Sequence, residues 1–463
     1  MIMAAVSFGL CVAASPTLAS SHRATYLHVV WMRSYAAPGT PARLNKVGVL
    51  KIGSPKARNV LVFEPGTSAG SAYIVPFAQW LTRSLPGWQV WSVERRQNLL
   101  EDQSVLTRAK SHRASTKQLF DYYLGWLVDS HIKHHVKFLA PTDASYAKSW
   151  GLNVAMKDLR VVIRKARKLG GKVVLSGHSL GGGLVTAYAT WNFGGRPGAD
   201  GLAGLVFDDG SSFPGSVSAA KAQSELAALM TRRSSPWGGV SGNSFPAPLL
   251  GLLSNTGGMA SLLQPNRPSL AVKILPAVLR PPVPLTNRAL FAYNTNVATS
   301  VLGKFDFAIL AHEGKGISGR IVHGVHTWND RGALTPPARY AAMLSGRQVA
   351  GADGVEWYFP ARLTLDLSVL NNGIRTEAQK VLDVQATMGR RLPKRLRMYA
   401  FGAAGGKVIL TATKQLAKQS RIPRRNLMLI NRHRTYAHND PAGAYPKNAF
   451  FAGLVKFLRQ IGR

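Results

Sequence analysis

One serine near the middle of the chain has the surroundings of a catalytic nucleophile. Ser179 is the centre of the segment Gly-His-Ser-Leu-Gly, residues 177–181, which fits the pattern G-x-S-x-G. Residues 173–176 are typical of a short buried strand, and residues 184–193 favour a buried helix. A sharp strand–turn–helix of this kind exposes the serine and directs the next backbone N–H toward a substrate oxygen. The segment therefore predicts acyl-transfer chemistry at Ser179.

A second copy of the pattern, residues 66–70, surrounds Ser68. It also follows an expected strand, at 59–63, but the helix after it begins late and contains Pro76. A G-x-S-x-G pattern arises easily by chance in a glycine-rich chain, so the structural context must decide between the copies. The context favours Ser179 as the nucleophile.

Strands and helices are expected to alternate on both sides of the Ser179 motif. Further strands are expected at 24–32, 46–53, 88–93, 202–207, 395–402 and 426–430, and helices at 73–85, 150–169, 407–418 and 448–461. This alternation predicts an α/β fold with a mostly parallel central sheet and helices on both faces. Together with the motif, the pattern resembles the α/β-hydrolase superfamily over about residues 20–211 and 395–463.

A serine hydroxyl becomes a nucleophile when a histidine, held by a carboxylate, accepts its proton. The resemblance implies that this histidine lies between the last strand and the last helix, where His438 stands; His433 is a rival closer to the strand. Relatives often carry the acid after the strand at 395–402, but no carboxylate follows it here. Others carry it after the strand that follows the nucleophile helix, where Asp209 is favoured and Asp208 is the alternative.

The negative oxygen of the tetrahedral intermediate needs two backbone N–H donors. The resemblance implies that one belongs to Leu180, directly after the nucleophile. The other is expected in the loop after the strand at 59–63, where Thr67 is the candidate and Ser68 is next. The second G-x-S-x-G copy would then form the oxyanion loop.

The alternation of strands and helices stops between residues 212 and 394, which are rich in proline and glycine. We expect this segment to be an inserted cap or lid domain between the two parts of the core. It contains Asp366, a distant third candidate for the acid. It also holds the pair His323 and His326, and His312 further upstream. Neither has the further ligands at the spacing that a metal site needs, so neither a metal nor another cofactor is expected.

The first 19 residues resemble a secretory signal peptide, with a short apolar run and a small-residue cleavage site. No basic residue precedes the apolar run, which departs from the usual pattern. Cys11, the only cysteine, lies inside this segment. The chain is therefore expected to be secreted or associated with the cell surface, without disulfides and without a transmembrane segment after residue 19.

The chain of 463 residues carries 58 Lys and Arg against 21 Asp and Glu, a formal charge of +37. Because the basic residues are scattered and do not gather in one segment, no specific nucleic-acid site is expected. The positive charge does predict attachment to anionic surfaces. The leading hypothesis is a secreted serine hydrolase that cleaves carboxylic esters of small molecules, lipids or polymers through an acyl-enzyme. The alternatives are an exopeptidase or amidase with the same triad, and a non-catalytic cationic binding protein on this fold.

Overall fold

The computed structural model describes residues 26–212, 217–238, 247–301 and 309–462. The expected signal peptide, residues 1–19 with Cys11, lies outside the described residues, so export stays a prediction. None of the described helices is both long and apolar enough to cross a membrane.

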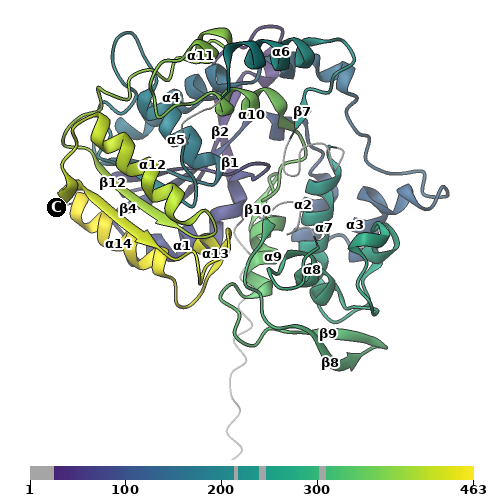
Figure 1. The fold of residues 1–463 in the computed structure, drawn as a ribbon. Helices are drawn as coiled ribbons and strands as arrows, with labels where there is room; N and C mark the ends of the chain where they lie inside the picture. The colour runs from purple at the N-terminus through teal and green to yellow at the C-terminus, as the bar shows by residue number, and fades with distance from the viewer. Residues whose placement is uncertain (1–25, 213–216, 239–246, 302–308, 463) are drawn as a thin grey trace, which may run out of the picture.

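A nine-stranded sheet forms the centre of the larger lobe (Figure 1). Its strands, in spatial order, are β10 (Val349–Ala350), β1 (Leu27–Arg33), β2 (Lys46–Ile52), β4 (Trp88–Glu94), β3 (Asn59–Glu64), β5 (Val173–His178), β6 (Gly204–Asp208), β12 (Arg397–Gly402) and β13 (Leu427–Asn431). All neighbours are parallel except that β2 runs antiparallel to β1 and to β4. The interior strands are buried on both faces, which explains their nearly continuous apolar sequences.

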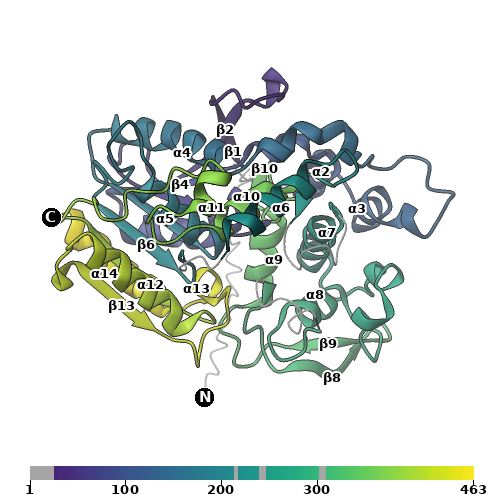
Figure 2. The same cartoon turned by 45° about the horizontal axis from the view of Figure 1, so that its top comes forward.

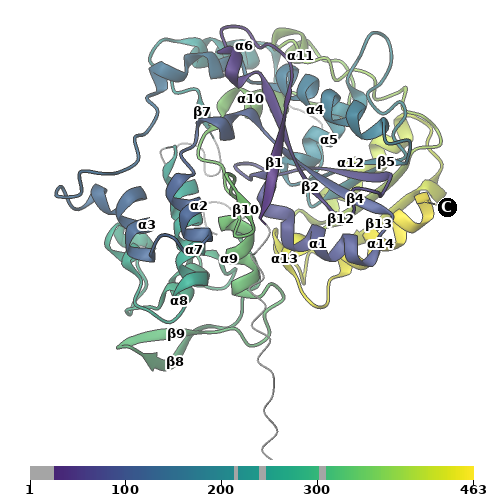
Figure 3. The same ribbon diagram turned by 180° about the vertical axis from the view of Figure 1, so that it is seen from behind.

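Five helices cover the two faces of this sheet, as the front and back views show (Figures 1 and 3). One face is covered by α4 (Leu152–Arg167), α5 (Leu180–Thr190) and α12 (Gly406–Gln419), and the other by α1 (Val75–Ser84) and α14 (Ala449–Gly462). Each face has its own apolar core. The predicted α/β fold is therefore confirmed, with helices on both sides of a mostly parallel sheet.

A second, mainly helical lobe lies beside the sheet (Figure 2). It contains α2 (Ser104–Lys110), α3 (Thr116–Tyr123), α7 (Leu249–Leu263), α8 (Asn287–Thr295), α9 (Pro337–Ser345) and the hairpin of β8 (Gly316–Val322) and β9 (Val325–Asn329). Helices α2, α3 and α7 contribute to one apolar cluster and α8 to a second, whereas α9 packs into the apolar core on one face of the sheet. The lobe thus combines residues of the inserted segment 212–394 with the much earlier residues 104–123.

The remainder of the inserted segment returns to the larger lobe. Its helices α6 (Ala219–Met230), α10 (Ala361–Ser368) and α11 (Glu377–Val381) pack together, with α10 against α4 and α5, and β10 adds an edge strand to the sheet. Residues 99–138 are helical only in α2, α3 and short 3-10 turns, and α11 ends at Val381.

Candidate active site

Ser179 lies on a very tight turn between β5 and α5. Its backbone has φ 55° and ψ −126°, a conformation that costs free energy for any residue other than glycine. The neighbouring chain leaves no room for side chains, because a Cβ on Gly177 would lie 2.2 Å from the carbonyl oxygen of Gly181. A Cβ on Gly181 would lie 2.1 Å from the carbonyl oxygen of Glu64. The glycines of the motif are therefore required by the turn that presents Ser179.

The structure brings His438 and Asp209 together, although 229 positions separate them. Asp209 follows β6, and His438 lies between β13 and the short helix α13 (Asp440–Gly443). Nδ1 of His438 lies 2.6 Å from Oδ2 of Asp209, and both side chains are almost completely buried. A carboxylate at Nδ1 fixes the tautomer that leaves Nε2 as the basic nitrogen.

The end of β12, where the sequence offers no carboxylate, supports Asp209 through its backbone. Oδ1 of Asp209 accepts hydrogen bonds from the N–H groups of Ala403 at 2.7 Å and Gly405 at 2.9 Å. Asp209 itself takes a positive φ of 43°. The position that looks vacant in the sequence therefore supplies the amides that hold a carboxylate from the neighbouring strand.

The other acid and histidine candidates lie elsewhere. Asp208 is completely buried, and neither of its carboxyl oxygens has a hydrogen-bond partner among the described residues. Burial, with a smaller contribution from Asp209, raises the pKa of Asp208 well above its ordinary value, which favours the protonated form of this carboxyl. Asp366 pairs with Arg362 and accepts the N–H of Leu152. His433 is exposed beside Asn431.

His178, the x residue before Ser179, holds the backbone of His438, a contact that the sequence does not predict. Nε2 of His178 lies 2.9 Å from the carbonyl oxygen of His438, and its ring stacks on Tyr73 at a centroid distance of 5.5 Å. Burial, with help from His438, lowers the pKa of His178 to about 3. The ring is therefore neutral and donates its Nε2–H to that carbonyl.

The residues after His438 are tied to the inserted segment. Asp440 is buried and accepts the N–H groups of Ala437 at 2.7 Å and His312 at 2.9 Å. Nδ1 of His312 lies 2.5 Å from the same carboxylate, and this hydrogen bond raises the pKa of His312 above its ordinary value. The tyrosine hydroxyl of Tyr73 donates to Asn439 at 2.7 Å. The loop that carries His438 is thus held from several directions.

Ser179 and His438 line one small pocket together with the loop after β3. That loop contributes residues 66–69, including the predicted oxyanion donor Thr67 and the rival serine Ser68. The loop lies directly against the nucleophile, since a Cβ on Gly66 would be 3.0 Å from the Cβ of Ser179. Leu180, the other predicted donor, is the first residue of α5. These positions are those that a nucleophile, a base and an oxyanion loop require.

A larger apolar cavity adjoins this pocket inside the helical lobe. The two share Leu250, Ser254, Ile309 and Leu344 as lining residues. The cavity has a volume of about 80 Å³, and most of its other lining side chains are apolar, among them Leu253, Leu275, Leu279, Leu290 and Phe291. An apolar group attached to a substrate carbonyl at Ser179 would have room to extend into it.

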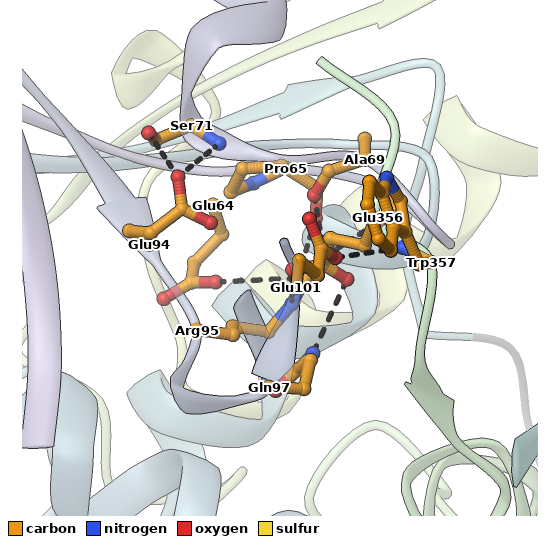
Figure 4. Close-up of polar contacts among 11 residues, drawn as sticks. Glu64, Pro65, Ala69, Ser71, Glu94, Arg95, Gln97, Glu101, Glu356 and Trp357 are labelled. Atoms are coloured by element: carbon orange, nitrogen blue, oxygen red, sulfur yellow. Dashed lines mark hydrogen bonds and ion pairs between the residues drawn. The ribbon is translucent and has the colours of Figure 1, made fainter. Parts of the chain in front are cut away.

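A cluster of five carboxylates is buried beneath the loop after β3, and most of its members are visible in Figure 4. This carboxylate cluster consists of Glu64, Glu94, Glu101, Asp353 and Glu356. Five of the 21 acidic residues of a strongly cationic chain thus meet at one buried place. The buried cations among them are Arg95 and Lys110, and burial raises the pKa of Glu64 to about 7 and that of Glu94 to about 8.

Glu94→Gln is expected to stabilise the protein increasingly as the pH rises from about 5 to 9. Unfolded glutamate releases its proton near its ordinary pKa of 4.5, whereas the pKa of folded Glu94 is about 8. Between these values the folded state binds more protons, so Glu94 lowers stability as the pH rises, by up to about 5 kcal/mol at 1.4 kcal/mol per pKa unit. Glutamine keeps an oxygen for the N–H and hydroxyl of Ser71 without this titration.

The measurement is the melting temperature of the variant minus that of the wild type, taken across this pH range. Glu225→Gln is the matched control, because Glu225 is partly exposed on α6 and pairs with Lys221 at the surface. The difference in melting temperature between Glu225→Gln and the wild type should stay nearly constant across this pH range. A constant difference for Glu94→Gln as well would contradict the raised pKa.

The side chains that commonly bind metal ions do not gather around a common point in the part of the chain that the structure describes. No group of three or more His, Cys, Asp or Glu side chains there has a geometry that could hold a metal ion. His323 and His326 lie at the β8–β9 hairpin, and His312 is engaged by Asp440.

No protein-family model matches the sequence, and no curated protein matches it. Solved structures do match. A candidate lipase from Sulfolobus solfataricus is 14% identical with a TM-score of 0.46, and the match covers 93% of each chain. The thioesterase domain from the curacin biosynthetic pathway is 12% identical with a TM-score of 0.39, covering 94% of this chain and 99% of that one. A monoglyceride lipase variant from Saccharomyces cerevisiae is 10% identical with a TM-score of 0.36, covering 93% and 99%.

These identities and TM-scores are too low to assign a fold or a function to this chain. The topology of the chain itself is more informative. The tight turn at Ser179 follows β5, Asp209 follows β6, and His438 follows the last strand, β13, of a sheet in which only β2 runs antiparallel to its neighbours. This sheet order and the strained serine turn identify the chain as having the α/β-hydrolase fold.

Proposed function

We propose that this protein is a serine hydrolase that cleaves carboxylic esters. The observation that carries the proposal is the 2.6 Å contact between His438 and Asp209, with His438 and Ser179 lining one pocket. A buried imidazole oriented by a carboxylate, next to a serine on a strained turn, is the arrangement that activates a hydroxyl for attack on a carbonyl.

In the proposed mechanism, Ser179 Oγ attacks the ester carbonyl while its proton passes to Nε2 of His438. The buried Asp209 carboxylate stabilises the imidazolium that forms. Backbone N–H groups of Leu180 and Thr67 hold the developing negative oxygen. When the intermediate collapses, His438 returns the proton to the departing alcohol, and an acyl-enzyme remains on Ser179. Water, deprotonated by His438, then releases the acid.

The adjoining cavity favours esters with an apolar acyl chain. Six of its lining residues are leucines, and it shares four lining residues with the pocket of Ser179. A peptide substrate would need charged groups for its termini, and none of the described residues that line the cavity is charged. Turnover of p-nitrophenyl esters should therefore exceed that of aminoacyl p-nitroanilides, and kcat/KM should rise from the acetate to the octanoate. A preference for the anilides would instead indicate an exopeptidase or amidase.

Gly257→Leu is expected to lower kcat/KM for the octanoate about 10-fold relative to the acetate, because the added side chain fills the cavity. Gly257 lies on α7 and lines the cavity. A Cβ there would meet only Phe291 at 3.9 Å, an ordinary contact, so the variant should fold. Replacing a helical glycine also favours the helix by up to about 1 kcal/mol.

The control for this variant is Gly257→Ala, which adds one methyl group and should leave the ratio of octanoate to acetate turnover within about twofold of wild type. An unchanged ratio in Gly257→Leu would place the acyl chain elsewhere. Equal losses on both esters would point to a general disturbance of the site.

A further inference from the structure

We propose that Arg95, anchored by Glu356, is the positioning residue of the oxyanion loop, defined here as residues 65–69. Arg95 holds the carbonyl of Gly66 on the side away from Ser179, so that the N–H of Thr67 faces the pocket. This inference rests on the proposed hydrolase function and extends it to a residue that does not line the pocket.

The guanidinium of Arg95 holds three carbonyl oxygens of the loop. Nη1 donates to Pro65 at 3.1 Å, and Nη2 donates to Gly66 at 2.9 Å and to Ala69 at 2.8 Å. Figure 4 shows the side chain of Arg95 reaching from the end of β4 to this loop. Five residues of irregular backbone are thereby tied to one side chain directly after β4.

Because the peptide bond is planar, a hydrogen bond from Arg95 to the Gly66 carbonyl also sets the direction of the Thr67 N–H. In a trans peptide the C=O and the N–H of the next residue point in opposite directions. The carbonyl of Gly66 and the N–H of Thr67 belong to one peptide unit, so a hydrogen bond from Arg95 to that oxygen turns the N–H away from Arg95. Gly66 and Thr67 both line the pocket with Ser179, whereas Arg95, which bonds the Gly66 carbonyl, is not among the residues that line it.

Glu356 fixes the guanidinium from the other side. Its carboxylate accepts Nε of Arg95 at 3.1 Å and Nη2 at 3.2 Å, and it also accepts Gln97 at 3.2 Å. The backbone N–H of Glu356 donates to the carbonyl of Ser68 at 3.0 Å. Because Glu356 belongs to the inserted segment, this segment holds the oxyanion loop both directly and through Arg95.

The charge of Arg95 adds to its geometric effect. Burial opposes the charged form, but Glu356 and Glu64 outweigh it and raise the pKa of Arg95 further, so the guanidinium stays protonated. A cation bonded to the carbonyl of Gly66 polarises that peptide unit and makes the N–H of Thr67 a stronger donor. Such a donor gains most when the substrate oxygen becomes negative, which is the transition state.

The test compares Arg95→Lys with Arg96→Lys. Arg96 is the adjacent residue and is also buried, but it bonds Asp158 at 2.6 Å and Tyr35 at 3.0 Å, away from the oxyanion loop. Lysine at 95 keeps the charge but cannot hold three carbonyls and Glu356 together. For Arg95→Lys we expect kcat on p-nitrophenyl butyrate to fall about 10- to 100-fold with KM within about threefold. Inhibition by an alkyl boronic acid, which mimics the tetrahedral intermediate, should weaken by the same factor.

Arg96→Lys should lower the melting temperature as much as Arg95→Lys, yet leave kcat within about twofold of wild type. Equal losses of kcat in both variants, or an unchanged kcat in Arg95→Lys, would overturn the positioning role. If Arg95→Lys does not fold, Glu356→Gln replaces it, and kcat should fall at constant KM. Activity that survives Ser179→Ala would refute the hydrolase mechanism itself, whereas an inactive Ser179→Ala beside a fully active Arg95→Lys would refute this inference alone.

Discussion

Replacement of Ser179 by alanine is expected to lower kcat for p-nitrophenyl ester hydrolysis by about 10⁴- to 10⁶-fold. The hydroxyl is the proposed nucleophile, and alanine fits the same turn because it adds nothing beyond the Cβ that serine already carries. The fold should therefore persist with an unchanged melting temperature, within about 2 °C. The residual rate would come from the oxyanion donors and from binding alone.

Ser68→Ala is the matched control for this variant. Ser68 is the centre of the second G-x-S-x-G copy, lines the same pocket and also has a positive φ, of 51°. Its carbonyl accepts the N–H of Glu356, and alanine keeps that contact. We expect its kcat within about threefold of wild type. A reversed pattern, with Ser68→Ala inactive and Ser179→Ala active, would assign the nucleophile to the other copy.

Asp209→Asn is expected to lower kcat about 10⁴-fold, the second largest effect. An amide can present its NH₂ to Nδ1 of His438, which favours the tautomer with the proton on Nε2 and so removes the base. The amide has one oxygen, whereas the carboxylate now accepts from His438 and from the N–H groups of Ala403 and Gly405. The measurement is kcat for ester turnover between pH 6 and 9.

The control for Asp209→Asn is the same change at the preceding residue. Asp208 is buried, its carboxyl has no hydrogen-bond partner in the described parts of the chain, and burial raises its pKa, which favours the neutral form. Asparagine has nearly the shape of a protonated aspartic acid. Asp208→Asn should therefore retain kcat within about threefold. A loss comparable to that of Asp209→Asn would show that the pair acts as one unit.

The part of the site that can be predicted from the sequence is the part encoded locally or by topology. Consecutive residues encode the strand, turn and helix around Ser179. Glycine is required at 177 and 181 because a Cβ at either position would lie less than 2.5 Å from a backbone carbonyl oxygen. Asp209 is favoured because it lies just past the end of a strand, and parallel strands bring their carboxyl ends to one edge. His438 is favoured by its place between the last strand and the last helix.

The residues that support the site cannot be predicted in this way, because their partners are far away in the chain. Arg95 meets Glu356 across 261 positions, and His178 meets His438 across 260. In the sequence, nothing distinguishes Arg95 from its neighbour Arg96. Only the structure shows that Arg95 bonds the oxyanion loop and that Arg96 pairs with Asp158. The helical lobe is hard to anticipate for the same reason, since α2 and α3 pack with helices that follow more than 120 residues later.

The central claim is that Ser179 carries the acyl group, and covalent labelling tests it most directly. A fluorophosphonate reacts with a serine only when a base and oxyanion donors activate it. After reaction of the wild-type protein, digestion and mass spectrometry should find the adduct on Ser179, in stoichiometric yield, and none in Ser179→Ala. An adduct on Ser68, or an unlabelled wild-type protein, would contradict the account.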